Sequence, residues 1–202
     1  MNRDGTMRHP AMRMGSKKKR ETFTQRVPAS ADDGRSHAGG NYNNNANNII
    51  FGDNTGAAFD SWIRYTSVTV PQGVRIISAN LELVSTGAET GDDVKLNIYC
   101  NDADTAVAPT DEDEHAALDR TTAFTVWDDI PSWSDNEVVT SPDFKSAVQE
   151  VIDRAGWASG NALMVLVDDD GSSSGAQRLP DSEDLGEGTE ALITIVYEPI
   201  GG

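Results

Sequence analysis

Apolar and polar residues alternate along much of the chain with a period of two, which is typical of strands that bury one face in a sheet. The strongest signal is residues 62–84, where two strand-like segments flank a turn at residues 71–73. In the second segment the alternation is regular from Ile77 to Leu83. The stretch therefore predicts a pair of strands joined by a turn, and we expect the rest of the fold to build outward from it.

The first strand of this pair changes parity part-way along. Ile63 and Tyr65 point to one face, whereas Val68 and Val70 fall on the other. A bulge or bend at residues 66–67 lets all four side chains face the core. We therefore expect the strand to be interrupted there.

Shorter apolar or alternating segments predict further strands. They occupy residues 22–29, 49–51, 94–100, 124–126, 163–167, 176–179 and 191–197. Pro28 favours an edge position for the first of them, and the unbroken apolar run 163–167 is typical of a strand buried on both faces. The last strand is expected to pair centrally. Residues 32–48 are rich in Gly and Asn and predict a loop.

One helix is predicted, at residues 142–155. Ser141 suits the N-cap, Pro142 suits the first helical position, and Gly156 follows the last turn. Apolar side chains recur along one face at helical spacing, and they are Phe144, Val148, Val151, Ile152 and Ala155. We expect this helix to cover one end of the molecule. The predicted fold class is an all-β sandwich with one short α-helix.

Composition agrees with this fold class. The chain has 18 glycines and only 6% aromatic residues, which suits many strands joined by turns. Its 202 residues are enough to bury a core without disulfides, and the single cysteine, Cys100, cannot form one within the chain. Cys100 lies on the inward parity of residues 94–100, so we expect a buried thiol instead of a nucleophile.

Charge divides the chain into two parts. Residues 1–26 contain eight basic and two acidic residues, a balance of +6, and the other 8 basic and 31 acidic residues give −23, for a total of −17. We predict a disordered or extended basic arm at residues 1–21 and a single sandwich domain at residues 22–202. The basic residues expected to bind a partner are Arg3, Arg8, Arg13, Lys17, Lys18, Lys19 and Arg20. A solvated tail or a vector-derived tag is the alternative.

The charge balance also excludes some partners. A body of −23 is not expected to bind nucleic acid or an anionic membrane. No apolar segment has the length of a membrane span or of a signal-peptide core. If the protein acts outside a cell, we expect it to leave by a route other than general secretion.

Sequence motifs for catalysis are missing. Three histidines and one cysteine cannot assemble a zinc site of ordinary spacing, and no G-x-S-x-G, Walker or G-x-G-x-x-G motif occurs. Carboxylates are abundant, so residue types alone leave a glycosidase open. Enzymatic activity is nevertheless not expected, and no cofactor is predicted.

Residues 101–120 form a long acidic segment that does not match an EF-hand. Counted from Asp102, the sixth position is Val107 instead of Gly, and the twelfth is Asp113 instead of Glu. We expect a solvated loop with His115 at the surface, and a non-standard calcium site is the alternative. The other candidate metal ligands follow the strand at 163–167, and they are Asp168, Asp169 and Asp170.

The four tryptophans fall into two groups. Trp127, Trp133 and Trp157 flank the predicted helix and its turns, where packing into hydrophobic corners is expected. Trp62 lies on the opposite parity from Ile63 and is predicted to be exposed. It is the candidate aromatic side chain for stacking on a sugar or for contact with a neighbouring subunit.

Three segments carry a family resemblance. They read IRYTSVTVPQGVRIISANLEL, TVWDDIPSW and TSPDFKSAVQEVIDRAGWASGNALMVLV. Together they resemble the DNRLRE domain, a module found in many bacterial and archaeal extracellular proteins and in some phage-encoded ones. The resemblance covers residues 22–199 and implies a jelly-roll β-sandwich, with carbohydrate binding proposed for some members. The matching positions are Ile63, Arg64, Tyr65, Pro71, Gly73, Ala79, Leu81, Trp127, Trp133, Pro142, Trp157, Gly160 and Asn161.

The departures from that family suggest a function. An extracellular type of sandwich without an export signal, carrying an arm of opposite charge, is what we expect of a virion component released by lysis. We therefore predict a non-enzymatic phage structural protein at the virion surface, either a head decoration (cement) protein or a tail-associated one. Its arm is expected to bind an acidic surface of a capsid or tail protein, and a homo-oligomer, dimer or trimer, is typical. The alternatives are an extracellular carbohydrate-binding module and a calcium-stabilised adhesin.

Overall fold

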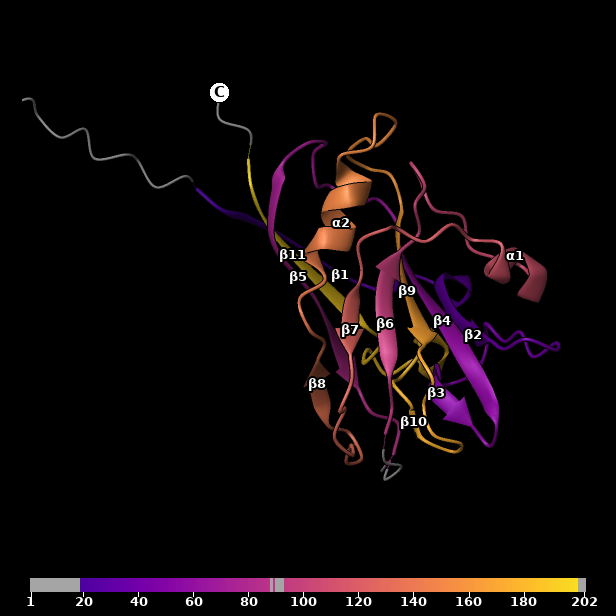
Figure 1. Cartoon of the computed structure of the whole chain (residues 1–202). Coiled ribbons are helices and arrows are strands. Elements are labelled where there is room, and N and C mark those ends of the chain that lie inside the picture. The colour runs from indigo at the N-terminus through magenta and orange to yellow at the C-terminus, as the bar shows by residue number, and fades with distance from the viewer. Residues whose placement is uncertain (1–18, 88, 90–92, 200–202) are drawn as a thin grey trace, which may run out of the picture.

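Two antiparallel β-sheets pack face to face in the computed structural model, which describes residues 19–87, 89 and 93–199 (Figure 1). The smaller sheet has the strand order β1 (Glu21–Arg26), β11 (Leu192–Glu198), β5 (Arg75–Val84) and β8 (Val138–Thr140). The larger sheet has the order β10 (Gln177–Arg178), β3 (Phe51–Asn54), β4 (Ala57–Tyr65), β9 (Leu163–Asp169), β6 (Leu96–Cys100) and β7 (Thr125–Trp127), and β2 (Asp33–Ser36) pairs with β4 beside this path. The predicted all-β sandwich is confirmed.

The two strands of residues 62–84 do not pair with each other, so that prediction is wrong. β4 pairs with β2, β3 and β9 in the larger sheet, whereas β5 pairs with β8 and β11 in the smaller one. The expected bend is real, because Ser67 has a left-handed φ of 54° and the strand ends at Tyr65. Beyond this bend, Val68 exchanges backbone hydrogen bonds with Gly160 and Asn161. The connection thus carries the chain from one sheet to the other.

Residue alternation predicts the buried side of β5 except at its beginning. Ala79, Leu81 and Leu83 are fully buried, but Ile76 is buried in place of the predicted Ile77. The cause is an extra residue in β5, because consecutive residues Val196 and Tyr197 of β11 pair with Ser78 and Ile76, and the skipped Ile77 moves the inward side by one residue. β11 lies between β1 and β5, as expected for the last strand, and β1 is an edge strand.

The short elements differ from prediction in their bounds. β2 lies inside the predicted loop 32–48, β3 begins where the predicted strand 49–51 ends, and β8 was not predicted. β9 is buried on both faces from Leu163 to Val167, as predicted, because it is central in the larger sheet and a second apolar layer covers its outer side.

The predicted helix is present but shorter, as α2 (Lys145–Ile152). Ser141 does not cap it, because its hydroxyl oxygen accepts a hydrogen bond from the backbone N–H of Leu81 in β5 at 2.9 Å. α2 packs against β5 of the smaller sheet and β6 of the larger one, so it bridges the two sheets (Figure 1). A second helix, α1 (Glu112–Ala116), was missed; the Asp111 side chain caps it by accepting from the N–H of Glu114 at 2.8 Å.

The core between the sheets contains the three tryptophans predicted to pack there, Trp127, Trp133 and Trp157. Cys100 is fully buried, as predicted, and burial raises the pKa of its thiol above the ordinary value. No helix among the described residues is long and apolar enough to cross a membrane.

Candidate functional site

The outer face of the larger sheet carries a second apolar cluster. Its buried members are Trp62, Ala106, Ala162, Met164 and Leu166, and Tyr42, Tyr99 and Leu118 pack against them. The segment 101–120 contributes Ala106 and Leu118 to this cluster, and His115 of α1 packs against Trp62. The acidic segment is therefore solvated over much of its length, as predicted, but its buried residues also cover part of the cluster.

Trp62 is fully buried within this cluster, so the prediction that it is exposed is wrong. Residue parity predicts the correct face of the sheet for the ring, but Tyr42 stacks on it with ring centroids 5.1 Å apart and planes at 14°. Gly34 of β2 lies directly beneath the ring, because a Cβ atom there would stand only 2.3 Å from Trp62. Trp62 cannot meet a sugar or a second subunit.

His115 is buried as well, in contrast to its predicted surface position. Its ring packs against Trp62 at 4.7 Å, and its Nδ1 is 2.6 Å from the hydroxyl of Ser36. Burial, aided by the positive charge of Arg120, lowers the pKa of His115 to about 4 and keeps the ring neutral at pH 7. The Ser36–His115 pair is buried beneath the segment 101–120.

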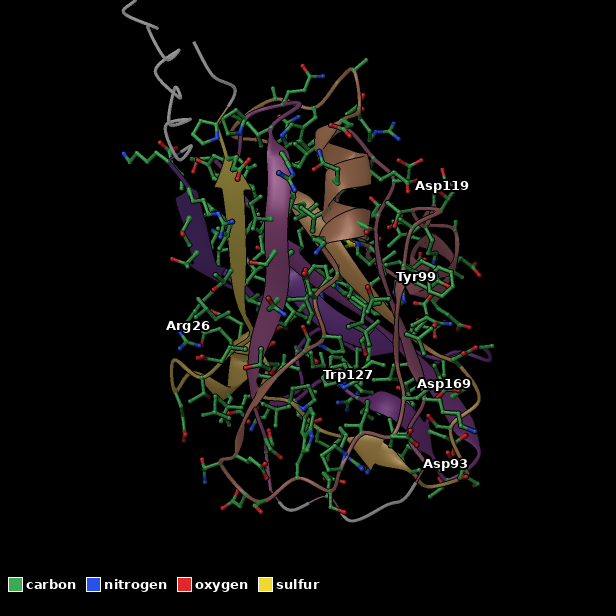
Figure 2. The ribbon with its side chains drawn as sticks, turned by 60° about the vertical axis from the view of Figure 1, so that its left-hand side comes forward. Arg26, Asp93, Tyr99, Asp119, Trp127 and Asp169 are labelled. Atoms are coloured by element: carbon green, nitrogen blue, oxygen red, sulfur yellow. The ribbon has the colours of Figure 1, made fainter. Side chains whose placement is uncertain are left out.

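The uncovered part of the outer face carries an exposed aromatic side chain. Phe124 is 47% exposed and Val126 of β7 is 51% exposed, and the Phe124 ring lies 5.1 Å from the ring of Tyr99 in β6. We call these three residues the outer-face patch. Figure 2 shows Tyr99 and Asp169 on the side of the molecule opposite Arg26 of β1.

A charged group borders the outer-face patch. Arg120 forms a two-pronged ion pair with Asp168, with Nε to Oδ2 at 2.9 Å and Nη2 to Oδ1 at 3.3 Å. Asp60 of β4 lies close by, and burial together with the Asp168 charge raises the pKa of Asp60 to about 6. Aromatic and charged side chains are thus adjacent on one face.

The three candidate metal ligands at the end of β9 do not converge. Asp168 is paired with Arg120, and the carboxylate of Asp169 accepts from the N–H groups of Gly171 and Ser172 to close a turn. Asp170 uses its backbone N–H to bind the carbonyl of Lys95. Within the described parts of the chain, no group of three or more His, Cys, Asp or Glu side chains is arranged to hold a metal ion.

The acidic segment also uses its carboxylates in ion pairs. Arg154, just beyond α2, pairs with both Asp102 and Asp104, the latter at 2.8 Å from Nε. These carboxylates anchor the segment to the end of the helix, which accounts for two of the acids considered above as calcium ligands.

Most of the basic arm lies outside the described residues, including Arg3, Arg8, Arg13, Lys17 and Lys18. Lys19 and Arg20 are described and exposed, and the Nε of Arg20 is 3.9 Å from the carboxylate of Glu198. Since β1 and β11 are antiparallel, the start of β1 lies beside the end of β11 (Figure 1). The described end of the arm is therefore at an edge of the smaller sheet.

No protein-family model matches the chain, and no curated protein is significantly similar to it. The resemblance to the DNRLRE domain therefore stays a prediction. Among the residues of the outer face, alternation in residues 94–100 does predict that Tyr99 points outward. Asp60, Arg120 and Phe124 carry no local signal, because only the tertiary fold brings them together.

Proposed function

We propose that the chain is a non-enzymatic structural protein of a virus particle, a head decoration or tail-associated protein at the virion surface. The basic arm binds an acidic surface of a capsid or tail protein, and the sandwich faces outward, in a dimer or trimer. The observation that carries this proposal is the division of charge, +6 in residues 1–26 against −23 in the rest. The positive arm is attracted to an acidic partner surface, whereas the negative sandwich is repelled by the same surface.

The position of the arm also supports this arrangement. Arg20 lies at the edge of the smaller sheet, and Arg26 of β1 lies on the side of the molecule away from Tyr99 (Figure 2). A protein held at that edge leaves the outer face of the larger sheet free. The outer face is then available for display.

Reversing charge in the arm is expected to weaken binding to the particle by at least about tenfold, which corresponds to about 1.4 kcal/mol. The variant changes Lys17, Lys18 and Lys19 to Glu. Binding is measured by co-sedimentation with particles of the virus that encodes the chain. The matched control makes the same charge change on exposed sandwich positions, Arg75→Glu, Lys95→Glu and Lys145→Glu. Equal binding by both variants would contradict the proposal.

The outer-face patch favours a second candidate function, an extracellular glycan-binding module. A sugar ring stacks well on an exposed aromatic side chain that has charged hydrogen-bonding groups nearby. Phe124 packs on Tyr99, and Tyr99 lies near the charges of Arg120 and Asp168. The outer-face patch thus meets that description, whereas the buried Trp62 does not.

This second candidate predicts saturable binding on a glycan array that Phe124→Ala reduces by about tenfold or more, since an aromatic contact contributes on the order of 1–2 kcal/mol. Val138→Ala is the control, because Val138 is 59% exposed but lies on β8 of the other sheet. Binding that Phe124→Ala leaves unchanged would exclude the outer-face patch as a glycan site.

A further inference from the structure

One long strand lies at the edge of the smaller sheet without a second partner. β1 has six residues, and among the described residues it pairs only with β11, in a register that runs without a shift from Glu21 to Arg26. Figure 2 shows β1, in indigo, at the margin of the molecule beside the yellow β11. The other strands at the ends of the two sheets, β7, β8 and β10, have three residues or fewer. β1 is therefore the longest sheet edge that the described part of the chain leaves open.

The backbone of β1 directs hydrogen-bonding groups away from the sheet at every second residue. Just beyond the strand, the N–H of Val27 donates to the carbonyl of Ala191 at 3.2 Å, in the same register as β1 and β11. In an antiparallel pair, the N–H and C=O groups of alternate residues point to the same neighbour. The groups of residues 21, 23 and 25 therefore point to β11. Those of Thr22, Thr24 and Arg26 point outward from the edge.

β1 lacks the devices with which proteins usually protect a long edge, which include Pro and Lys residues, bulges and very short strands. The sequence of β1, ETFTQR, contains neither Pro nor Lys, and its pairing with β11 has no bulge. Its charged residues, Glu21 and Arg26, stand at its two ends. Thr22 and Thr24 are exposed and are of a residue type that favours strands and cross-strand pairs. The edge is thus suited to pair with a strand of another molecule.

We propose that β1 pairs with β1 of a second copy of this chain, antiparallel and about a two-fold axis at Thr24, so that the two smaller sheets join into one. Thr24 then lies opposite Thr24 of the second copy, and Thr22 lies opposite Arg26. The outward groups of each such pair meet as donor and acceptor. A register centred on Phe23 would instead place Arg20 opposite Arg26, and two like charges in that position repel. The inference rests on the dimer of the proposed function and not on attachment to a virus particle.

The antiparallel arrangement also keeps the two basic arms apart. Arg20 of one copy lies beside Pro28 of the other, so the two Arg20 residues are separated by about eight residues, or about 26 Å at about 3.3 Å per residue. This distance exceeds the Debye length of about 8 Å at physiological salt. A parallel pair would bring the arms side by side. The net charge of −17 on each chain still opposes association, so we expect dimerisation to strengthen as salt is added.

Sedimentation equilibrium of the full chain in about 0.3 M sodium chloride tests the dimer. A monomer–dimer equilibrium is expected. Thr24→Pro is expected to weaken it by about tenfold or more, because Pro removes an outward N–H from each copy. The intrachain pairing with β11 does not use that N–H, so Pro is tolerated there. Thr24→Val is the matched control, since it keeps the N–H and the branched side chain, and it is expected to dimerise like the unaltered chain.

Cross-linking tests the register even if Thr24→Pro does not fold. Thr24→Cys is expected to be linked into a dimer by a short bismaleimide, because the Cα atoms of opposite residues in such a pair are about 5.5 Å apart. Thr140→Cys is the control, since Thr140 is also exposed and lies on β8, the opposite edge of the same sheet. We expect it to react at least about tenfold more slowly than Thr24→Cys, by chance collision. Cys100 is fully buried and does not compete.

Three results would overturn the proposed pairing. The first is a chain that stays monomeric up to about 1 mM. The second is a trimer, because a two-fold interface closes at two copies. The third is a dimer that Thr24→Pro leaves unchanged and in which both cysteine variants are cross-linked equally, which would place the contact on another surface. No virus particle enters these measurements, so their failure is distinct from a failure of the arm to bind one.

Discussion

Replacing Trp62 with alanine is expected to lower the free energy of unfolding by about 3–5 kcal/mol, the usual cost of removing a large buried aromatic side chain. The ring is fully buried between the larger sheet and its cover, where Tyr42 and His115 pack on it and Met164 and Leu166 belong to the same cluster. Its loss leaves a cavity beneath the segment 101–120. Urea-induced unfolding followed by circular dichroism measures the change.

Phe124→Ala is the matched control for that experiment. Both changes remove an aromatic ring from the outer face, but Phe124 is 47% exposed and its removal is expected to cost about 1 kcal/mol or less. If the two variants lose the same free energy of unfolding, Trp62 is not covered by the segment 101–120. The prediction that its ring is exposed would then be correct.

Replacing Arg178 with methionine is expected to cost about 3–5 kcal/mol, because it removes a buried, hydrogen-bonded charge. Arg178 is 1% exposed, and its guanidinium donates to the carbonyls of Pro131, Ile130 and Gln177 at 2.8, 2.5 and 2.8 Å. Methionine keeps much of the apolar volume but leaves these carbonyls without their donor. The loss is measured by chemical denaturation.

Arg75→Met provides the comparison for Arg178, since the Arg75 side chain is 76% exposed and pairs only at the surface. Its replacement is expected to change stability by about 0.5 kcal/mol or less. If both replacements change the free energy of unfolding equally little, the hydrogen bonds of Arg178 do not stabilise the contact between β10 and residues 130–131.

Local patterns predict the strands well and their partners poorly. Alternation marks which side of β5 and β6 is apolar, because apolar side chains turn toward the core whichever strands lie beside them. Pairing depends on residues far along the chain, so the neighbouring strands β4 and β5 fall in different sheets. The same limit explains Ser141, whose hydroxyl binds β5 instead of capping α2.

The errors at Trp62 and His115 have one physical cause. Parity predicts which face of a sheet a side chain lies on, but not whether another segment covers that face. The cover of Trp62 includes α1, whose five residues carry three acids and looked like a solvated loop. The sequence does not indicate that Arg178 is buried, because the backbone carbonyls that accept its hydrogen bonds come from residues 130 and 131, far from it in the chain.

The most direct test of the proposed virion function is limited proteolysis of the arm, with fragments identified by mass spectrometry. The free protein is compared with the protein bound to virus particles. We predict cleavage within residues 1–21 of the free protein and protection of the same residues on the particle, while the sandwich stays intact in both. Equal cleavage of the arm in the two samples would contradict docking through the arm.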